Sequence, residues 1–275
     1  MDYDIAVQVA VTYRKISGNS IKISGGDPAF WQYLIQYVAF LKQELNYEHI
    51  EVITRSAKIA EYLDDLKYVG LDVINFSWDT TNKDKYIYIT KKNDFEQLRD
   101  IIIYAAHQMY CKINMVILPN TSETDINNML EFCATNGIRE LKLLDYIDDI
   151  QENAIHEGTV SNHFDLIYKQ LEQITSNFDI ALQGGLGHPM RVYKISDNLK
   201  VICKDARQGA WYFELCKKCE HYPCHDAVMA LRVTPSNSFQ LCLLNKKMNS
   251  NFNLGDIEQQ LEIIMKHYEN AFFKS

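Results

Sequence analysis

Four cysteines near the C-terminus are the residues whose type and spacing point most directly to chemistry. They are Cys216, Cys219, Cys224 and Cys242, four of the seven cysteines in the chain. Because only two residues separate the first pair, a tight turn can aim both thiolates at one centre. Thiolates are soft ligands, and a set of four selects zinc or an iron–sulfur cluster over hard cations. The spacing predicts a metal site and leaves both metals open; for zinc, His221 and His225 are alternative ligands.

Basic residues flank the cysteine segment on both sides. They are Arg191, Lys204, Arg207 and Arg232. A guanidinium presents a fork of N–H donors that matches a phosphate or a carboxylate. We take these four residues as candidates for a substrate-binding pocket, with solvated hairpin charges as the alternative.

The composition limits the class of protein. The 275 residues carry a net charge of −8, with 47% hydrophobic and 23% charged residues, the balance of a globular protein. No run of Lys and Arg is long enough to follow a phosphate backbone, so nucleic-acid binding is not expected. No apolar run approaches a membrane span, and the N-terminus lacks a secretory pattern, so we expect a cytoplasmic protein without a membrane partner. There, Cys111, Cys133 and Cys203 are expected to be buried apolar residues rather than disulfide partners.

Helix and strand patterns alternate through the first half of the chain. Expected strands are 20–24, 49–54, 73–78, 112–118 and 140–146, and expected helices are 5–15, 28–45, 59–69, 94–110 and 122–136. Strands that alternate with helices of this length predict right-handed βαβ units and a parallel sheet. We expect this sheet to curve into part of a barrel.

The pattern changes after residue 149. Expected there are a helix at 162–176, a strand at 178–182, hairpins within 191–204 and 230–244, and a final helix at 255–272. The sequence therefore predicts two domains, an α/β domain over 1–150 and a small β-rich module over 151–275 that carries the four cysteines.

The cysteine segment also resembles a known module. Cys216-Lys-Lys-Cys219-Glu-His-Tyr-Pro-Cys224, followed by Ala230-Leu-Arg-Val-Thr-Pro and Gln240-Leu-Cys242, is similar to the C-terminal cluster module of radical S-adenosylmethionine (SAM) enzymes. The branch is the one that contains GTP 3′,8-cyclase. The resemblance implies one auxiliary [4Fe–4S] cluster on the four cysteines, beside the substrate, and so favours iron over zinc.

The first half resembles the same family. Ile21-Lys-Ile-Ser-Gly25-Gly26-Asp27-Pro28 is similar to the Gly-Gly-Glu-Pro motif that holds the SAM amino group, and Val73-Ile-Asn-Phe-Ser77-Trp-Asp79-Thr80 resembles the fourth barrel strand. Lys112-Ile-Asn-Met-Val-Ile-Leu-Pro resembles the fifth. The resemblance implies SAM contacts at Gly25, Gly26, Asp27 and Ser77. It implies an α/β fold, an incomplete parallel (β/α) radical-SAM-type barrel with a C-terminal cluster-binding module.

One part of the family pattern is missing. These enzymes bind the cluster that cleaves SAM with a Cys-x3-Cys-x2-Cys loop ahead of the Gly-Gly motif, but only 24 residues precede Gly25 and none is a cysteine. We therefore expect weak or lost SAM binding and a truncated chain that is inactive alone. The alternatives are a degenerate member that serves as a binding, partner or electron-transfer protein, and a zinc-stabilised structural protein.

The expected substrate is a small molecule or a peptide, and a partner protein is compatible with the pattern. GTP itself is a poor match, because Asp27 replaces the family's Glu and the paired arginines of the cluster module reduce to Arg232.

Overall fold

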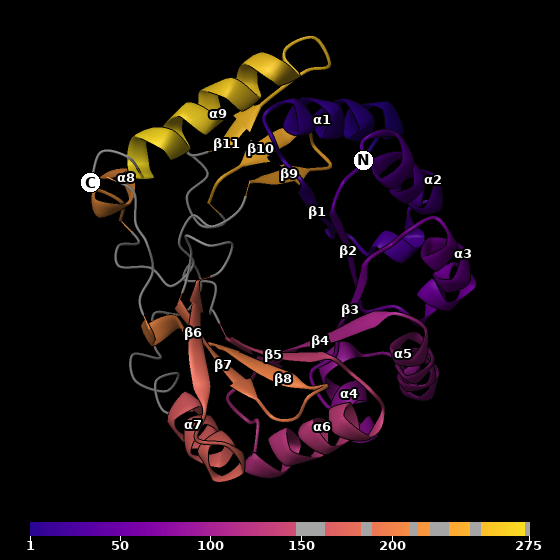
Figure 1. Ribbon diagram of the computed structural model, residues 1–275, viewed down its shortest axis with the longest axis vertical. Coiled ribbons are helices and arrows are strands. Elements are labelled where there is room, and N and C mark those ends of the chain that lie inside the picture. Colours follow the sequence, from indigo (N-terminus) through magenta and orange to yellow (C-terminus); the bar gives the residue numbers. More distant parts are fainter. Residues whose placement is uncertain (147–162, 183–188, 209–213, 221–230, 243–248, 273–275) are drawn as a thin grey trace.

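The computed structural model describes residues 1–146, 163–182, 189–208, 214–220, 231–242 and 249–272. These residues form an eight-stranded sheet in the order β1-β2-β3-β4-β5-β8-β7-β6 and a three-stranded sheet in the order β11-β10-β9. Figure 1 shows the large sheet as an arc with helices along its outer side. The arc is open, so the predicted incomplete barrel is confirmed.

The first half supplies five parallel strands. They are β1 (Ser20–Ile23), β2 (His49–Thr54), β3 (Val73–Ser77), β4 (Tyr110–Ile117) and β5 (Glu140–Asp145). The helical segments are α1 (Tyr3–Lys15), η1 (Pro28–Phe30), α2 (Leu34–Ala39), η2 (Phe40–Glu44), η3 (Ala57–Glu61), α3 (Leu63–Tyr68), α4 (Lys83–Thr90), α5 (Phe95–Gln108) and α6 (Glu123–Thr135). Among the described strands, β1 lies at the edge of the large sheet, as expected.

Local sequence signals explain where these elements begin. Asp2 caps α1, and Ser122 and Asp125 form a reciprocal capping box at the start of α6. Alternation then assigns the faces of the strands. On β4 the buried residues Cys111, Ile113 and Met115 alternate with partly exposed polar ones, so one face packs on the helices and the other faces into the arc.

The second half extends the large sheet. Helix α7 (His163–Ile174) leads to β6 (Phe178–Leu182), β7 (Pro189–Lys194) and β8 (Lys200–Lys204). Strand β8 pairs parallel with β5, while β7 pairs antiparallel with β8 and with β6. The predicted first hairpin is confirmed, and it continues the large sheet. The boundary at residue 150 stays a prediction, but it does not coincide with an end of this sheet.

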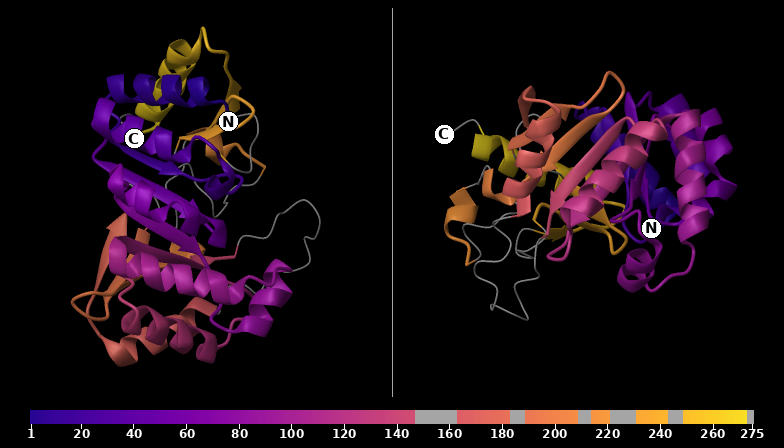
Figure 2. Two further views of the ribbon diagram at one scale, coloured as in Figure 1. Left: turned by 90° about the vertical axis from the view of Figure 1, so that its right-hand side faces the viewer. Right: turned by 90° about the horizontal axis from the view of Figure 1, so that it is seen from below.

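The small sheet and the last helix form a second cluster. Its elements are α8 (Glu214–Lys217), β9 (Arg232–Thr234), β10 (Ser238–Gln240), β11 (Asn249–Asn251) and α9 (Ile257–Phe272), whereas the short η5 (Ala206–Gln208) follows β8 of the large sheet. Helix α9 lies along α1 (Figures 1 and 2), where the Lys15 ammonium is 3.1 Å from a Glu258 carboxylate oxygen. No described helix is long and apolar enough to cross a membrane.

Two helix predictions needed correction. The segment 28–45 was expected as one helix, but it is broken at Trp31, which is extended, and it ends in a π-helical turn. Helix α4 was not predicted, because its Tyr-Ile-Tyr-Ile run favours a strand and only Tyr86 among its residues is buried. Asn82 caps the start of this helix, and Lys91, in the left-handed conformation with a φ of 58°, ends it.

Candidate functional site at the carboxyl ends of the parallel strands

The loop after β1 presents open backbone at the carboxyl edge of the sheet. Gly25 has a φ of 111°, a conformation that favours glycine. Among the described residues, no heavy atom lies within 4 Å of the position that a Cβ would occupy on Gly25 or Gly26. A ligand can therefore approach the peptide groups of this loop closely.

Asp27 fastens this loop to the next strand. One carboxylate oxygen accepts hydrogen bonds from the Thr54 hydroxyl at 2.6 Å and the Ala29 N–H at 3.1 Å, and the other accepts from the Arg55 N–H at 2.8 Å. The same side chain caps η1. Asp27 thus holds the ends of β1 and β2 together, a role that sequence reasoning missed because the two partners are 27 residues apart. Direct contact of Asp27 with SAM stays a prediction.

Ser77 ends β3 at the same edge. The register places Ser77 opposite Asn114 of β4. Two residues later, a carboxylate oxygen of Asp79 accepts a hydrogen bond from the Val116 N–H at 2.8 Å, so the ends of β3 and β4 are also tied. Burial raises the pKa of Asp79.

A ladder of opposite charges lines the inward face of the arc. Glu51 is almost fully buried, 3.2 Å from the Lys22 ammonium and 3.5 Å from that of Lys112. Glu140 continues the ladder, 3.7 Å from Lys112 and 3.0 Å from Lys200. Burial alone would raise the pKa of Glu51, but the two lysines and a 2.7 Å hydrogen bond from the Asn75 amide outweigh it and lower the pKa to about 2.

Lys142 of β5 belongs to the same face and was not singled out from the sequence. Its neighbours Leu141 and Leu143 are fully buried, so alternation turns Lys142 into the arc. Burial lowers its pKa to about 8, and the positive charges of Lys22 and Lys204 add to this effect. The signal in the sequence was the alternation in 140–145, which gives the face but not the neighbours.

The described cysteines of the predicted metal site lie in the second cluster. Cys216 and Cys242 are buried in one apolar cluster with Phe239 and Leu261. The Cys219 N–H donates to the Cys216 carbonyl at 2.9 Å, which closes the expected turn between this pair. Cys224, His221 and His225 lie outside the described residues. Within the described part of the chain, no three His, Cys, Asp or Glu side chains are grouped closely enough to hold a metal ion.

The other three cysteines are buried as predicted. Cys111, Cys133 and Cys203 each have 0% exposure, and burial raises the pKa of each thiol.

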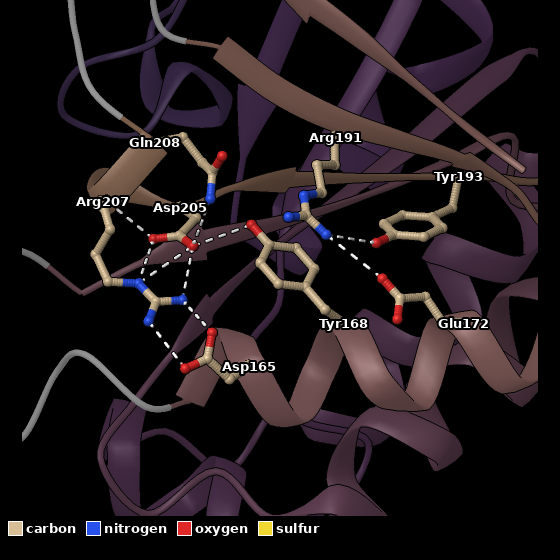
Figure 3. A network of polar contacts seen from close by, with 8 residues as sticks. All are labelled: Asp165, Tyr168, Glu172, Arg191, Tyr193, Asp205, Arg207 and Gln208. Atoms are coloured by element: carbon tan, nitrogen blue, oxygen red, sulfur yellow. Dashed lines mark hydrogen bonds and ion pairs between the residues drawn. The ribbon is translucent and has the colours of Figure 1, made fainter. Parts of the chain in front are cut away.

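Two of the four predicted basic residues are engaged with α7 (Figure 3). The Arg207 guanidinium contacts Asp205 and Asp165, each at 2.9 Å, and these carboxylates raise its pKa. The Arg191 guanidinium lies 4.0 Å from the centre of the Tyr168 ring and 3.4 Å from Glu172.

The four predicted basic residues come from different elements of the structure. Arg232 belongs to the small sheet, opposite Gln240, whereas Lys204 ends β8 of the large sheet. The observed partners of Arg191 and Arg207 give these two arginines a role in joining α7 to the sheet. Binding of substrate by the four residues stays a prediction.

The first 133 residues match the Radical SAM superfamily. Over these residues the chain is similar to that superfamily. It is similar to a GTP 3′,8-cyclase of Lactiplantibacillus plantarum, with 23% identity over 98% of this chain and 78% of the relative. A probable GTP 3′,8-cyclase of Methanothermobacter thermautotrophicus is 25% identical over 88% of this chain and 72% of its own length.

Solved structures support the fold. Streptococcus suis SuiB bound to its precursor peptide SuiA matches with a TM-score of 0.64 and 13% identity over 93% of this chain. SuiB without the peptide matches with a TM-score of 0.60 and 13% identity over 86% of this chain. The chain spans 57% and 54% of these two structures.

Proposed function

We propose that this chain is a radical SAM family protein, that it holds SAM at the carboxyl edge of its open barrel, and that it binds one auxiliary [4Fe–4S] cluster beside a small-molecule or peptide substrate. The observation that supports the proposed SAM site is the set of hydrogen bonds that Asp27 accepts, here called the Asp27 clasp. It joins the ends of β1 and β2 and leaves the Gly25 and Gly26 peptides open to a ligand.

The residues at this edge of the sheet suit the amino-acid end of SAM. The open peptides of Gly25 and Gly26 suit its amino group, and the register brings Ser77 to the same edge. When bound to a reduced cluster, SAM supplies a 5′-deoxyadenosyl radical. These 275 residues contain no Cys-x3-Cys-x2-Cys motif, so we propose that alone they bind SAM weakly and do not cleave it.

The auxiliary cluster is proposed on Cys216, Cys219, Cys224 and Cys242. Support comes from soft thiolate donors, from the turn that joins the first pair, and from the burial of two of the thiols in one apolar cluster. An apolar surround of this kind limits the access of solvent to a cluster. Zinc on the same residues is the alternative, and metal analysis separates the two.

The SAM site is tested by a glycine that can accept a side chain without disturbing the fold. A Cβ on Gly26 meets no described atom within 4 Å, so Gly26→Val is expected to fold and to fill the space above the loop. Gly255→Val is the matched control, because Gly255 is equally open and lies in the turn before α9.

Both variants and the parent chain are titrated anaerobically with SAM by equilibrium dialysis. We expect at least tenfold weaker binding for Gly26→Val and unchanged binding for Gly255→Val. Equal SAM affinity in all three proteins would overturn the proposed site. A protein that holds the cluster but binds no SAM would instead support the partner or electron-transfer role.

A further inference from the structure

Lys142 lies in one cross-strand row with the proposed SAM site. The register pairs Lys142 of β5 with Asn114 of β4, and Asn114 with Ser77 of β3. Directly paired residues point to the same face of a sheet, and adjacent strands are about 4.8 Å apart. The Cα atoms of Lys142 and Ser77 are therefore roughly 10 Å apart, and both side chains lie on the inward face.

Curvature brings the charges of distant strands toward Lys142. The pKa of Lys142 responds to Lys22 on β1 and Glu51 on β2, although β1 and β5 are separated by three strands in the sheet. It also responds to Lys204 of β8 and to Glu140 of its own strand. The lysine thus projects into the concavity of the arc.

The inward face has more cations than anions. At the inward positions of β1–β5 and β8, five lysines oppose two glutamates; besides His49, these residues are Lys22, Lys112, Lys142, Lys200, Lys204, Glu51 and Glu140. This local excess of positive charge stands in a chain whose net charge is −8. It favours an anion on this face.

The two glutamates are already engaged by other lysines. Glu51 contacts Lys22 and Lys112, and Glu140 contacts Lys112 and Lys200. In the part of the chain that the structure describes, Lys142 makes no hydrogen bond or ion pair. A half-buried ammonium without a counter-ion is costly, and a bound anion would offset that cost.

We propose that Lys142 binds an anionic group, a carboxylate or a phosphate, of the substrate that the concave face receives. This inference rests on the proposed function, because it places the substrate on the face that adjoins the SAM loops. Of the basic residues expected from the sequence, Lys204 lies on this face.

The proposal is tested on the full chain with simple anions and without SAM. Inorganic phosphate and acetate are titrated by isothermal calorimetry at pH 7, against the parent chain, Lys142→Gln, Lys142→Arg and Lys169→Gln. Lys169 is an exposed lysine of α7 and serves as the matched removal of one charge. Circular dichroism checks that each variant is folded.

We expect Lys142→Gln to bind the preferred anion at least tenfold more weakly, and Lys142→Arg and Lys169→Gln to bind it as the parent does. The preferred anion identifies the group as phosphate or carboxylate. The acetate or phosphate affinity of the parent should also fall as the pH rises from 7 to 9.5, whereas that of Lys142→Arg should not.

Two results would overturn the proposal: a parent chain that binds neither anion, or an anion affinity that Lys142→Gln leaves unchanged. The Gly26→Val variant separates this outcome from failure of the SAM site. It should lose SAM binding and keep anion binding, because it leaves the lysine face untouched.

Discussion

The charge of Lys142 should lower the stability of the folded protein at neutral pH. Removing that charge should show by how much the free energy of unfolding changes. The folded pKa of about 8 lies below the ordinary value of 10.5, so folding disfavours the charged form. One pKa unit corresponds to about 1.4 kcal/mol, which gives an upper limit of about 3 kcal/mol for this shift. Screening by solvent lowers that limit, because the side chain is only half-buried.

The sign of the pH dependence follows from the same shift. The unfolded chain binds a proton at Lys142 up to about pH 10.5, whereas the folded chain releases it near pH 8. The penalty is therefore fully present below pH 8, declines between pH 8 and 10.5, and is absent above that range.

Lys142→Met keeps the length of the stem and removes the charge. Urea unfolding at pH 7 should show a free energy of unfolding that is higher than the parent's by about 1–3 kcal/mol. At pH 10.5 the two proteins should be nearly equal. Lys169→Met on α7 should show no such difference at either pH. A Lys142→Met protein that is less stable at pH 7, or whose advantage does not change with pH, would refute the reasoning.

Three further predictions concern the clasp, the charge ladder and the cysteines. Asp27→Ala removes a helix cap and two links to β2, so urea unfolding should show a loss of about 1–3 kcal/mol, which Asp27→Asn should only partly restore; an unchanged stability would contradict the clasp. Glu51 has a folded pKa of about 2 against 4.5, so it should contribute up to about 3 kcal/mol above pH 4.5 that is lost as the pH falls toward 2. Glu51→Gln should abolish this loss of stability at low pH, as measured by pH-jump unfolding. An unchanged acid dependence of stability in Glu51→Gln would contradict the proposed pairing of Glu51 with the lysines. Cys219→Ala should lose the brown colour of the anaerobically reconstituted protein while Cys111→Ala keeps it, and colour retained by Cys219→Ala would remove this residue from the ligand set.

Local signals in the sequence predicted most of the elements. The parallel βαβ order followed from alternating patterns, and the helix expected at 122–136 is α6, which Ser122 caps. Cys111 was expected to be buried, and it lies on the buried face of β4. These features depend on neighbours within a few positions, which is why a single sequence reveals them.

The contacts of the site depend on distant residues and were not predictable in this way. The Asp27–Thr54 link and the position of Lys142 among Lys22 and Lys204 require the register and curvature of the whole sheet. Arg207 looked like a ligand-binding residue because a guanidinium near a cysteine motif suits an anion. Its partners in the structure include Asp165 of α7 and Asp205, which directly follows β8.

Iron analysis tests the central claim most directly, because the proposed cluster distinguishes a radical SAM family protein from a zinc-stabilised one. The full chain is purified anaerobically and reconstituted with iron and sulfide. Unbound metal is removed, and the protein is analysed for iron, sulfide and zinc. We predict about four irons and four sulfides per chain and a visible charge-transfer absorption. A colourless protein that holds one zinc per chain and no iron would contradict it.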